Sequence, residues 1–254
     1  MDYGLQGKVA LVTGTASQIG MGKAICLTLA KEGCDIVSAD IDLEGAKQTA
    51  AAVKSVGRQA IVLKADVANS SEVNEMVNAA LREFRKIDIL VNTAGLNAEK
   101  MPFTESNYEA WAKNLSVNLY GTMNCAKAVI PGMVERKYGK IINFSSDAAK
   151  MGSTNSYAAA KAGVLAFTRG LASQFGPSGI NANAISPAIV NTNFSVGLSD
   201  ELVKHMSEDF NARVPLRRTP TVADIANVVA FLASDVSKNI TGQCIHVDSG
   251  LIML

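Results

Sequence analysis

The chain has 254 residues, 48% of them hydrophobic, and its formal net charge at pH 7 is +1. A chain of this length and apolar content can bury one substantial core, so we expect a single domain over residues 1–254. Because its Lys and Arg residues are spread along the sequence, neither a nucleic acid nor an anionic membrane surface is an expected partner.

No charged and then apolar leader precedes the first predicted strand, and no apolar stretch approaches the roughly 18 residues that cross a bilayer. We therefore expect a soluble protein of the cytoplasm. The four cysteines are scattered, form no C-x-x-C pair and are accompanied by only two histidines: Cys26, Cys34, Cys125, Cys244, His205 and His246. This spacing predicts buried free thiols in a reducing compartment and no metal site.

Short apolar runs rich in β-branched residues alternate with longer patterns that are typical of helices. The predicted strands are residues 9–13, 35–39, 60–64, 87–91, 140–144, 180–185 and 243–247. Strands that alternate with helices form parallel sheets, and continuous apolar strands indicate helices on both faces. The sequence therefore predicts an α/β fold with a doubly wound sheet of seven parallel strands.

Residues between the strands mark the helix boundaries. Gly33 follows an apolar pattern as a helix C-terminal glycine does, and Asn69 with Glu72 is typical of an N-terminus with a capping box. Gly176 and Pro177 end the long helical pattern that follows the fifth strand. No internal repeat or low-complexity linker divides the chain.

One connection is long and irregular, at about residues 186–216. Two prolines bracket residues 191–194, and residues 200–206 form a short amphipathic pattern. A long connection at the carboxyl end of a strand is typical of a binding loop, so we predict a substrate lid there.

The first predicted strand runs directly into a glycine-rich turn, Gly14-x5-Gly20-x-Gly22, and then into a helix. In this context, backbone N–H groups and the positive end of the helix dipole bind a pyrophosphate. We predict dinucleotide contacts at these glycines and at Gln18 and Ile19 of the turn.

Asp40 ends the second predicted strand about 20 residues after this turn, where a carboxylate accepts hydrogen bonds from an adenosine ribose. Ile41 and Asp42 follow it, so a 2′-phosphate would meet negative charge and no adjacent basic residue. We therefore predict NAD as the cofactor and disfavour NADP. Alternatively, Asp40 caps the helix that begins near Leu43, although Asp42 is better placed for that role.

The most informative motif is Tyr157-x-x-x-Lys161, with Ser146 eleven residues upstream. The surrounding sequence is typical of a helix, and the i, i+4 spacing places the phenol and the ammonium on one face. A nearby cation lowers the pKa of a phenol from its usual value of about 10, which suits a general acid/base. The alternative is a chance pairing on a helix surface.

Together these motifs resemble those of the short-chain dehydrogenase/reductase family, in its one-domain form of about 250 residues. The resemblance spans essentially the whole chain and implies a Rossmann-type domain. The motifs that carry it, in the family's order, are Thr13-Gly14…Gly20-x-Gly22, Asp66-Val67, Asn92-Thr93-Ala94-Gly95, Asn118, Ser146, Tyr157-x-x-x-Lys161, Pro187…Thr192 and Val247-Asp248-Ser249-Gly250.

The resemblance implies a catalytic set of four residues. Tyr157 exchanges a proton with the substrate oxygen, and Ser146 polarises that oxygen. Lys161 binds the nicotinamide ribose and lowers the pKa of Tyr157, while Asn118 holds a water of a proton relay. Ser145 competes for the serine role, although Ser146 matches the family's position, and Asn118 is alternatively a structural amide.

The resemblance also implies cofactor contacts outside the glycine turn. It assigns Asp66 and Val67 to the adenine. It assigns further residues to the adenosine ribose, the nicotinamide ribose and the carboxamide. These are Asn92, Ala94 and Gly95 beside the adenosine ribose, Tyr157 and Lys161 at the nicotinamide, and Val190 and Thr192 at the carboxamide.

The chain departs from the family pattern at several positions. The glycine turn is two residues longer than usual, and the segment from Ser146 to Tyr157 is two residues shorter. Thr93 replaces an Asn, and Ala188 and Ser249 replace glycines. Within the shortened segment, Asp147 is either an acceptor for a substrate hydroxyl or a surface charge, and we favour the surface charge.

The expected activity is NAD(H)-dependent interconversion of a neutral secondary alcohol and a ketone. An enoyl reductase is disfavoured because that branch of the family is expected to space its Tyr and Lys farther apart, and an epimerase because no large C-terminal substrate domain is present. The alternative from another class is an NAD-binding redox sensor or scaffold that performs no chemistry.

Two long helical patterns, residues 107–134 and 156–175, resemble the helices that pair between subunits in this family. A homotetramer is therefore expected, with a dimer as the smaller assembly. Alternatively, the small residues of the second pattern bury it within one chain.

Overall fold

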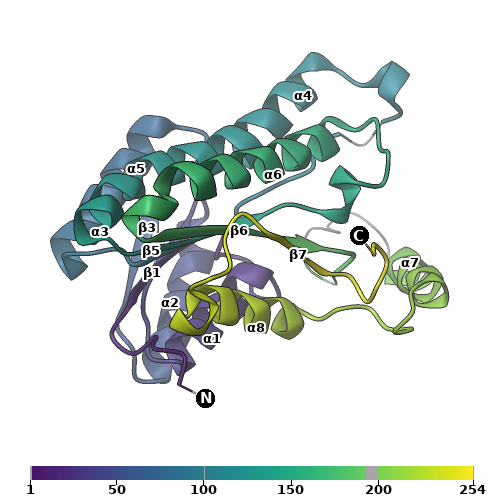
Figure 1. Ribbon diagram of the computed structural model, residues 1–254. Helices are drawn as coiled ribbons and strands as arrows, with labels where there is room; N and C mark the ends of the chain where they lie inside the picture. The colour runs from purple at the N-terminus through teal and green to yellow at the C-terminus, as the bar shows by residue number, and fades with distance from the viewer. Residues whose placement is uncertain (1, 100, 191, 193–199, 254) are drawn as a thin grey trace.

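A computed structural model describes residues 2–99, 101–190, 192 and 200–253 of the chain (Figure 1). Its seven strands form one parallel sheet in the order β3-β2-β1-β4-β5-β6-β7. The strands are β1 Val9–Thr13, β2 Asp35–Asp40, β3 Ala60–Lys64, β4 Ile89–Asn92, β5 Gly139–Phe144, β6 Ile180–Pro187 and β7 Cys244–Val247. The seven predicted strands and their parallel arrangement are thereby confirmed.

Helices cover both faces of this sheet, as Figure 1 shows. One layer contains α1, α2 and α8, and the opposite layer contains α3, α4, α5 and α6. Their bounds, with that of α7 at the edge, are α1 Met21–Lys31, α2 Leu43–Ser55, α3 Ser70–Phe84, α4 Tyr108–Leu115, α5 Gly121–Arg136, α6 Ser156–Phe175, α7 Asp200–Arg213 and α8 Val222–Ala233.

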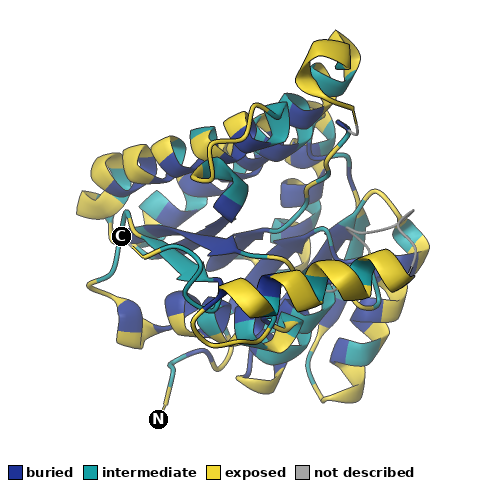
Figure 2. Cartoon of the chain, turned by 90° about the vertical axis from the view of Figure 1, so that its right-hand side faces the viewer, coloured by how far each residue is buried: buried dark blue, intermediate teal, exposed yellow. Residues whose placement is uncertain are grey.

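The core consists of two hydrophobic clusters, one on each face of the sheet. In β1, Ala10 and Val12 belong to the cluster beneath α1 and α8, whereas Val9 and Leu11 belong to the cluster beneath α3 and α5. Successive strand residues point to opposite faces, so a strand covered on both sides must be apolar throughout. Figure 2 accordingly shows buried strands and helices whose outward faces are exposed.

The observed helix N-caps agree with the signals in the sequence, but the predicted capping box at α3 is wrong, because Glu72 accepts from the Asp66 N–H and the Asn69 side-chain amide and not from the Asn69 backbone. Asp42 caps α2 by accepting the N–H groups of Glu44 and Gly45, and Asn69 caps α3 in the same way. Gly33, at a φ of 99°, follows the C-cap of α1. Such positive φ values favour glycine, which explains the choice of residue at this helix end.

The predicted lid contains α7, in which Phe210 is buried, and Val214 is buried directly after the helix. Residues 191 and 193–199, including Phe194 and Leu198 of the predicted lid, lie outside the described part of the chain. Within the described part, no helix is both long and apolar enough to cross a membrane.

The predicted free thiols are observed at all four cysteines, three of them buried. Burial raises the pKa of Cys34 and of Cys125 to about 12, and it also raises that of Cys26. These three thiols are therefore unreactive core groups. Cys244 departs from the expectation because it is only partly buried.

Candidate active site

The carboxyl ends of the strands bring the predicted site residues to one edge of the sheet. The strand order reverses between β1 and β4, and ligands of open α/β sheets bind in the crevice at such a reversal. The glycine turn follows β1, Asp40 ends β2, Asn92 ends β4 and Ser146 follows β5. Tyr157 and Lys161 lie in the first two turns of α6.

The glycines of the first turn are required by close backbone contacts. Gly14 has a φ of 72°, and a Cβ atom there would lie 2.8 Å from Cα of Ala94. At Gly22, a Cβ atom would lie 2.1 Å from the carbonyl oxygen of Gly14. Gly20 is the N-cap of α1, whose first N–H groups have no partner within the helix. Turn and helix thus form the cradle that a pyrophosphate requires.

Within the lengthened turn, Gln18 links the turn to the start of α2. The Gln18 side chain donates hydrogen bonds to the carbonyl oxygens of Ala16 and Gly45 and accepts one from Lys23. Turn and helix border a pocket of about 410 Å³. Gln18, predicted to contact the cofactor, thus uses its amide to hold the turn, while Ile19 is 55% exposed.

Ser17, which the sequence analysis did not single out, has the most specific fit to a bound phosphate. Its hydroxyl oxygen is buried and has no hydrogen-bond partner among the described residues. Buried polar groups are rarely left unpaired, so an orphaned hydroxyl beside a helix N-terminus fits an anionic ligand. The residues of the turn therefore fit a dinucleotide.

Asp40 connects the glycine turn to β2. One carboxylate oxygen accepts the N–H of Ala16 at 2.8 Å, and the other accepts the N–H of Asp42 at 2.9 Å. Because Asp42 is the N-cap of α2, the alternative that Asp40 caps this helix is wrong. Each carboxylate oxygen can accept more than one hydrogen bond, so Asp40 retains capacity for ribose hydroxyls.

The residues expected near the adenosine differ in burial and in the hydrogen bonds that they already make. Val67 is buried against Gly121, and Asp66 accepts the N–H of Ala68. Asn92 is 2% exposed and donates to the side-chain oxygen of Asn143 at 2.9 Å, so its amide joins β4 to β5. Burial at the sheet centre accounts for this structural use.

Thr93 and Ala94 join β4 to β1 at the same edge. The Thr93 hydroxyl donates to the carbonyl oxygen of Thr13, and the N–H of Ala94 donates to the Thr13 hydroxyl at 3.2 Å. Thr93, which replaces the family's Asn, thus helps to position Gly14.

Ser145 and Ser146 have different surroundings. Ser145 is buried and donates its hydroxyl to the carbonyl oxygen of Lys161 at 2.9 Å. Ser146 is only partly buried, accepts the N–H of Ala148 and hydrogen bonds with Tyr157. The geometry therefore favours Ser146 as the residue beside a substrate oxygen.

Tyr157 and Lys161 lie on the same face of α6. The Lys161 Nζ atom is 5.6 Å from the centre of the Tyr157 ring and donates to the carbonyl oxygen of Phe144 at 2.8 Å. Lys161 is 4% exposed, and burial lowers its pKa from 10.5 to about 8. A buried ammonium loses hydration that one carbonyl contact does not replace.

The expected fall in the pKa of Tyr157 is wrong for the protein alone. Burial raises the pKa of Tyr157 above 10, and only the hydrogen bond from Ser146 acts in the opposite direction. Loss of hydration disfavours a phenolate, and this effect exceeds the help of the Ser146 hydroxyl.

Asn118 lies in a π-helical turn, Ser116–Tyr120, between α4 and α5. Its side chain accepts the N–H of Leu96 at 3.3 Å and donates to the carbonyl oxygens of Leu96 and Asn114. A Cβ atom at Gly95 would lie 2.8 Å from Asn118 Oδ1 and 3.5 Å from Lys161 Nζ. Asn118, Gly95 and Lys161 therefore meet, with the Asn118 amide engaged structurally, and the water relay stays a prediction.

The carboxamide contacts predicted beyond β6 are both buried. Val190 is 9% exposed and belongs to the hydrophobic cluster under α8, and Thr192 is 8% exposed. Between them, residue 191 lies outside the described chain.

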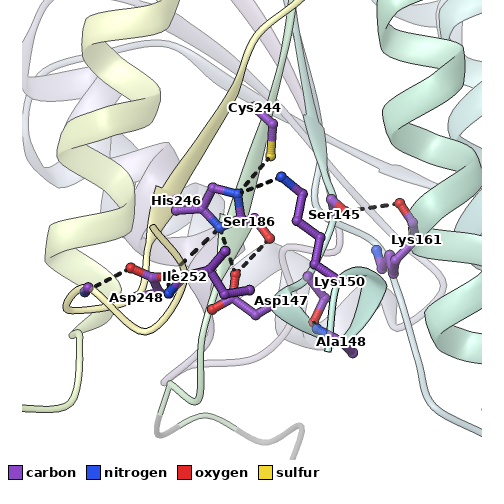
Figure 3. A network of polar contacts seen from close by, with 12 residues as sticks. Ser145, Asp147, Ala148, Lys150, Lys161, Ser186, Cys244, His246, Asp248 and Ile252 are labelled. Carbon is purple, nitrogen blue, oxygen red and sulfur yellow. Dashed lines mark hydrogen bonds and ion pairs between the residues drawn. The ribbon is translucent and has the colours of Figure 1, made fainter. Parts of the chain in front are cut away.

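The prediction that Asp147 is a surface charge is wrong, because its side chain is only 4% exposed. It accepts the Ser186 hydroxyl at 2.9 Å and lies 3.0 Å from Nδ1 of His246 (Figure 3). Burial raises the pKa of Asp147, while these two hydrogen bonds act in the opposite direction. The carboxyl ends of neighbouring parallel strands meet, and this signal could have joined Asp147 to Ser186 and His246.

Comparison with known proteins identifies the family. The sequence profile of a family described as Enoyl-(Acyl carrier protein) reductase matches residues 14–252. The chain is 38% identical to the 3-oxoacyl-[acyl-carrier-protein] reductase FabG of Staphylococcus epidermidis, over 97% of this chain and 99% of the relative. It is also 38% identical to the (2S)-[(R)-hydroxy(phenyl)methyl]succinyl-CoA dehydrogenase subunit BbsD of Thauera aromatica, over 97% of each chain.

Solved structures give the same result. Levodione reductase is 31% identical and superposes with a TM-score of 0.91 over 96% of this chain and 97% of that chain. NAD⁺-bound xylitol dehydrogenase is 30% identical, with a TM-score of 0.89 over 97% and 99%. From the motifs, the sheet order and these relatives, the chain belongs to the short-chain dehydrogenase/reductase family of oxidoreductases.

Proposed function

We propose that this protein is an NAD(H)-dependent oxidoreductase that interconverts a secondary alcohol and a ketone by hydride transfer. The observation that carries the proposal is the meeting of Ser146, Tyr157 and Lys161 at the sheet edge that also holds the glycine turn. A phenol with a hydroxyl on one side and an ammonium on the other suits proton transfer at a substrate oxygen.

Each residue of this set has a separate task in the proposed reaction. In oxidation, Tyr157 accepts the alcohol's O–H proton, and in reduction it donates a proton to the carbonyl oxygen. Ser146 donates a hydrogen bond that orients the same oxygen. Lys161 binds the nicotinamide ribose and, as a cation near the Tyr157 ring, is proposed to favour the phenolate when the dinucleotide is bound. A bound nicotinamide dinucleotide supplies or accepts the hydride.

The preference for NAD rests on negative charge near the adenosine ribose. Asp40 directs its carboxylate to the glycine turn, and Asp42 and Glu44 follow at the start of α2. A 2′-phosphate would be repelled there, whereas ribose hydroxyls can donate to Asp40. NAD⁺-bound xylitol dehydrogenase, a structural relative, is consistent with this preference.

The substrate class is supported by the chemistry that the relatives' names share. A 3-oxoacyl reductase acts on a ketone, and a dehydrogenase of a hydroxy compound acts on an alcohol. The profile description instead names an enoyl reductase. We favour the ketone reaction because Tyr157 and Lys161 are four residues apart and Ser146 hydrogen bonds with the phenol.

The test of this proposal is reduction of NAD⁺ or NADP⁺ at 340 nm with a panel of cyclic, aliphatic and sugar-derived secondary alcohols. We expect turnover with NAD⁺, and Tyr157→Phe should reduce kcat by roughly 10²–10⁴-fold while NADH binding is retained. The control is Tyr138→Phe, because that phenol hydrogen bonds to Asp235 at the opposite end of the sheet. Turnover that survives in Tyr157→Phe would remove the proton-transfer role, and intact NADH binding without turnover on any alcohol would favour the non-catalytic sensor.

We further propose a homotetramer assembled through α5 and α6. Tyr120 and Met123 are 54% and 39% exposed at the start of α5, where large apolar side chains suit contact with a second copy. Sedimentation equilibrium tests this assembly, and a monomer would contradict it.

A further inference from the structure

A second group of ionisable side chains lies at the sheet edge formed by β6 and β7, beside the proposed catalytic set (Figure 3). It consists of Asp147, His246 and Asp248, and one ligand atom from each lies within 4.8 Å of the other two. We propose that these three residues bind a divalent transition-metal ion, for which Zn²⁺ is the experimental probe. Nitrogen and carboxylate ligands of this kind suit such ions.

The distances in the cluster are close to those of a metal site. Nδ1 of His246 lies 3.0 Å from Oδ1 of Asp147 and 3.8 Å from Oδ2 of Asp248. Bonds of about 2.0–2.2 Å in a tetrahedral site hold the ligand atoms roughly 3.3 Å apart. Figure 3 shows the two carboxylates turned toward the imidazole from separate segments. Small movements would therefore close the three ligands on one ion.

An unpaired oxygen in this cluster points to a missing ligand. Oδ2 of Asp147 is buried and has no hydrogen-bond partner within the described part of the chain. A buried carboxylate oxygen without a partner is costly, and an ion is one of the groups that satisfies it. The other oxygen, Oδ1, already accepts from the Ser186 hydroxyl and pairs with Nδ1 of His246, so Oδ2 is the oxygen left for an ion.

Outer contacts hold both carboxylates in place. Asp248 accepts the N–H groups of Gly250 at 2.9 Å and Ile252 at 2.7 Å, and Ser186 fixes Asp147. Ligating carboxylates in metal sites are commonly oriented by such hydrogen bonds. The donor set and its supports are thus preorganised by three separate segments of the chain.

The contact with Lys150 suits one tautomer of a neutral imidazole. The Lys150 Nζ atom lies 3.1 Å from Nε2 of His246 and can only donate, so in this tautomer Nε2 accepts and the proton is on Nδ1. When a metal bonds to Nδ1, this ring proton moves to Nε2, and the exposed Lys150 side chain turns toward solvent. The ammonium therefore competes with the metal.

The first experiment is a titration of the full-length, EDTA-treated protein with Zn²⁺, followed by calorimetry and by imidazole ¹⁵N NMR. The chain has only two histidines, so both rings can be assigned. We expect one equivalent to bind and His246 to change from the Nδ1–H to the Nε2–H tautomer, while the exposed His205 keeps its spectrum. An unchanged His246 ring at saturating Zn²⁺ would overturn the proposal. The readout needs no turnover and so is independent of the proposed reaction.

Variants separate a metal site from an ordinary hydrogen-bonded pair. Asp147→Asn and His246→Gln should each lower the Zn²⁺ affinity by more than about 100-fold, since loss of a mere outer contact costs 10–100-fold. Lys150→Ala should raise the affinity, and this exposed variant covers the case in which Asp147→Asn fails to fold. His205→Gln is the control that should bind as the wild type does.

One neighbouring thiol requires its own control. Cys244 Sγ lies 3.9 Å from Nε2 of His246 and could capture Zn²⁺ by itself. Cys244→Ser should retain binding. Loss of binding in Cys244→Ser, or a weaker Zn²⁺ affinity in Lys150→Ala, would contradict the assignment of Asp147, His246 and Asp248 as the ligands.

Discussion

The two ends of the candidate site depend on different parts of the chain, one on its backbone and the other on its side chains. The glycine turn at the dinucleotide end depends on backbone, because Gly14 and Gly22 approach other main-chain atoms closely. The catalytic end depends on buried polar side chains, which are Ser145 and Asp147 after β5 and Lys161 in α6. Substitutions in the glycine turn should therefore act through steric clash and weaker dinucleotide binding. Substitutions of catalytic side chains should act on kcat.

The largest effect in this comparison is expected at the paired serines. Ser146→Ala should lower kcat by roughly 10²–10³-fold, as loss of one donor to a reacting oxygen does. Ser145→Ala removes the bond to Lys161 and should mainly lower the free energy of unfolding, by about 1 kcal/mol. Steady-state kinetics and denaturant unfolding of both variants test this, and equal losses of kcat would contradict the division of roles.

A steric effect is expected next, at the glycine turn. The added methyl group of Gly22→Ala would lie 2.1 Å from the Gly14 carbonyl oxygen, so the turn must move. We expect a loss of about 1–3 kcal/mol in the free energy of unfolding, together with weaker NADH binding.

The matched control for that variant is Gly170→Ala in α6. A Cβ atom at Gly170 meets no other atom within 4 Å. It should gain about 0.5–1 kcal/mol from helix propensity and bind NADH normally. Similar results for the two variants would show that backbone proximity at Gly22 is unimportant.

A smaller effect is expected from charge at the ribose end. Asp40→Asn keeps an oxygen for the Ala16 N–H and removes the negative charge. We expect the ratio of kcat/KM for NAD⁺ over NADP⁺ to fall about tenfold, which corresponds to roughly 1.4 kcal/mol. Glu32→Gln is the control, because it removes an exposed charge at the C-cap of α1, at the end of that helix away from the glycine turn. An unchanged ratio in Asp40→Asn would remove its assigned ribose role.

A further effect at the catalytic end is a pH dependence of stability from Lys161. Its pKa is about 8 in the folded protein and 10.5 in the free side chain, so the unfolded chain binds more protons between these values. Stability should therefore rise with pH across this window, relative to Lys161→Met. Melting temperatures of both proteins without dinucleotide test this, and a constant difference would mean that the ammonium remains hydrated.

Much of the site could be predicted from the sequence because its signals are local. The spacing of Tyr157 and Lys161 already predicted their shared helix face. The glycines of the first turn predicted close contacts between backbone segments. By contrast, Asn92 and Asn118 are polar residues whose amides turn out to be engaged in buried contacts. Their sequence neighbours carry no sign of those partners.

The sequence by itself determined which segments form the seven strands and the helices between them. It also identified the main helix caps and the family motifs. These features depend on neighbours within a few residues, where periodicity and backbone preference decide the conformation. Only the tertiary structure decided that Asp147 is buried, that the pKa of Tyr157 is raised and that His246 lies beside Asp147 and Asp248. Burial and charge depend on groups about 100 residues away in the chain, which the sheet alone brings into contact.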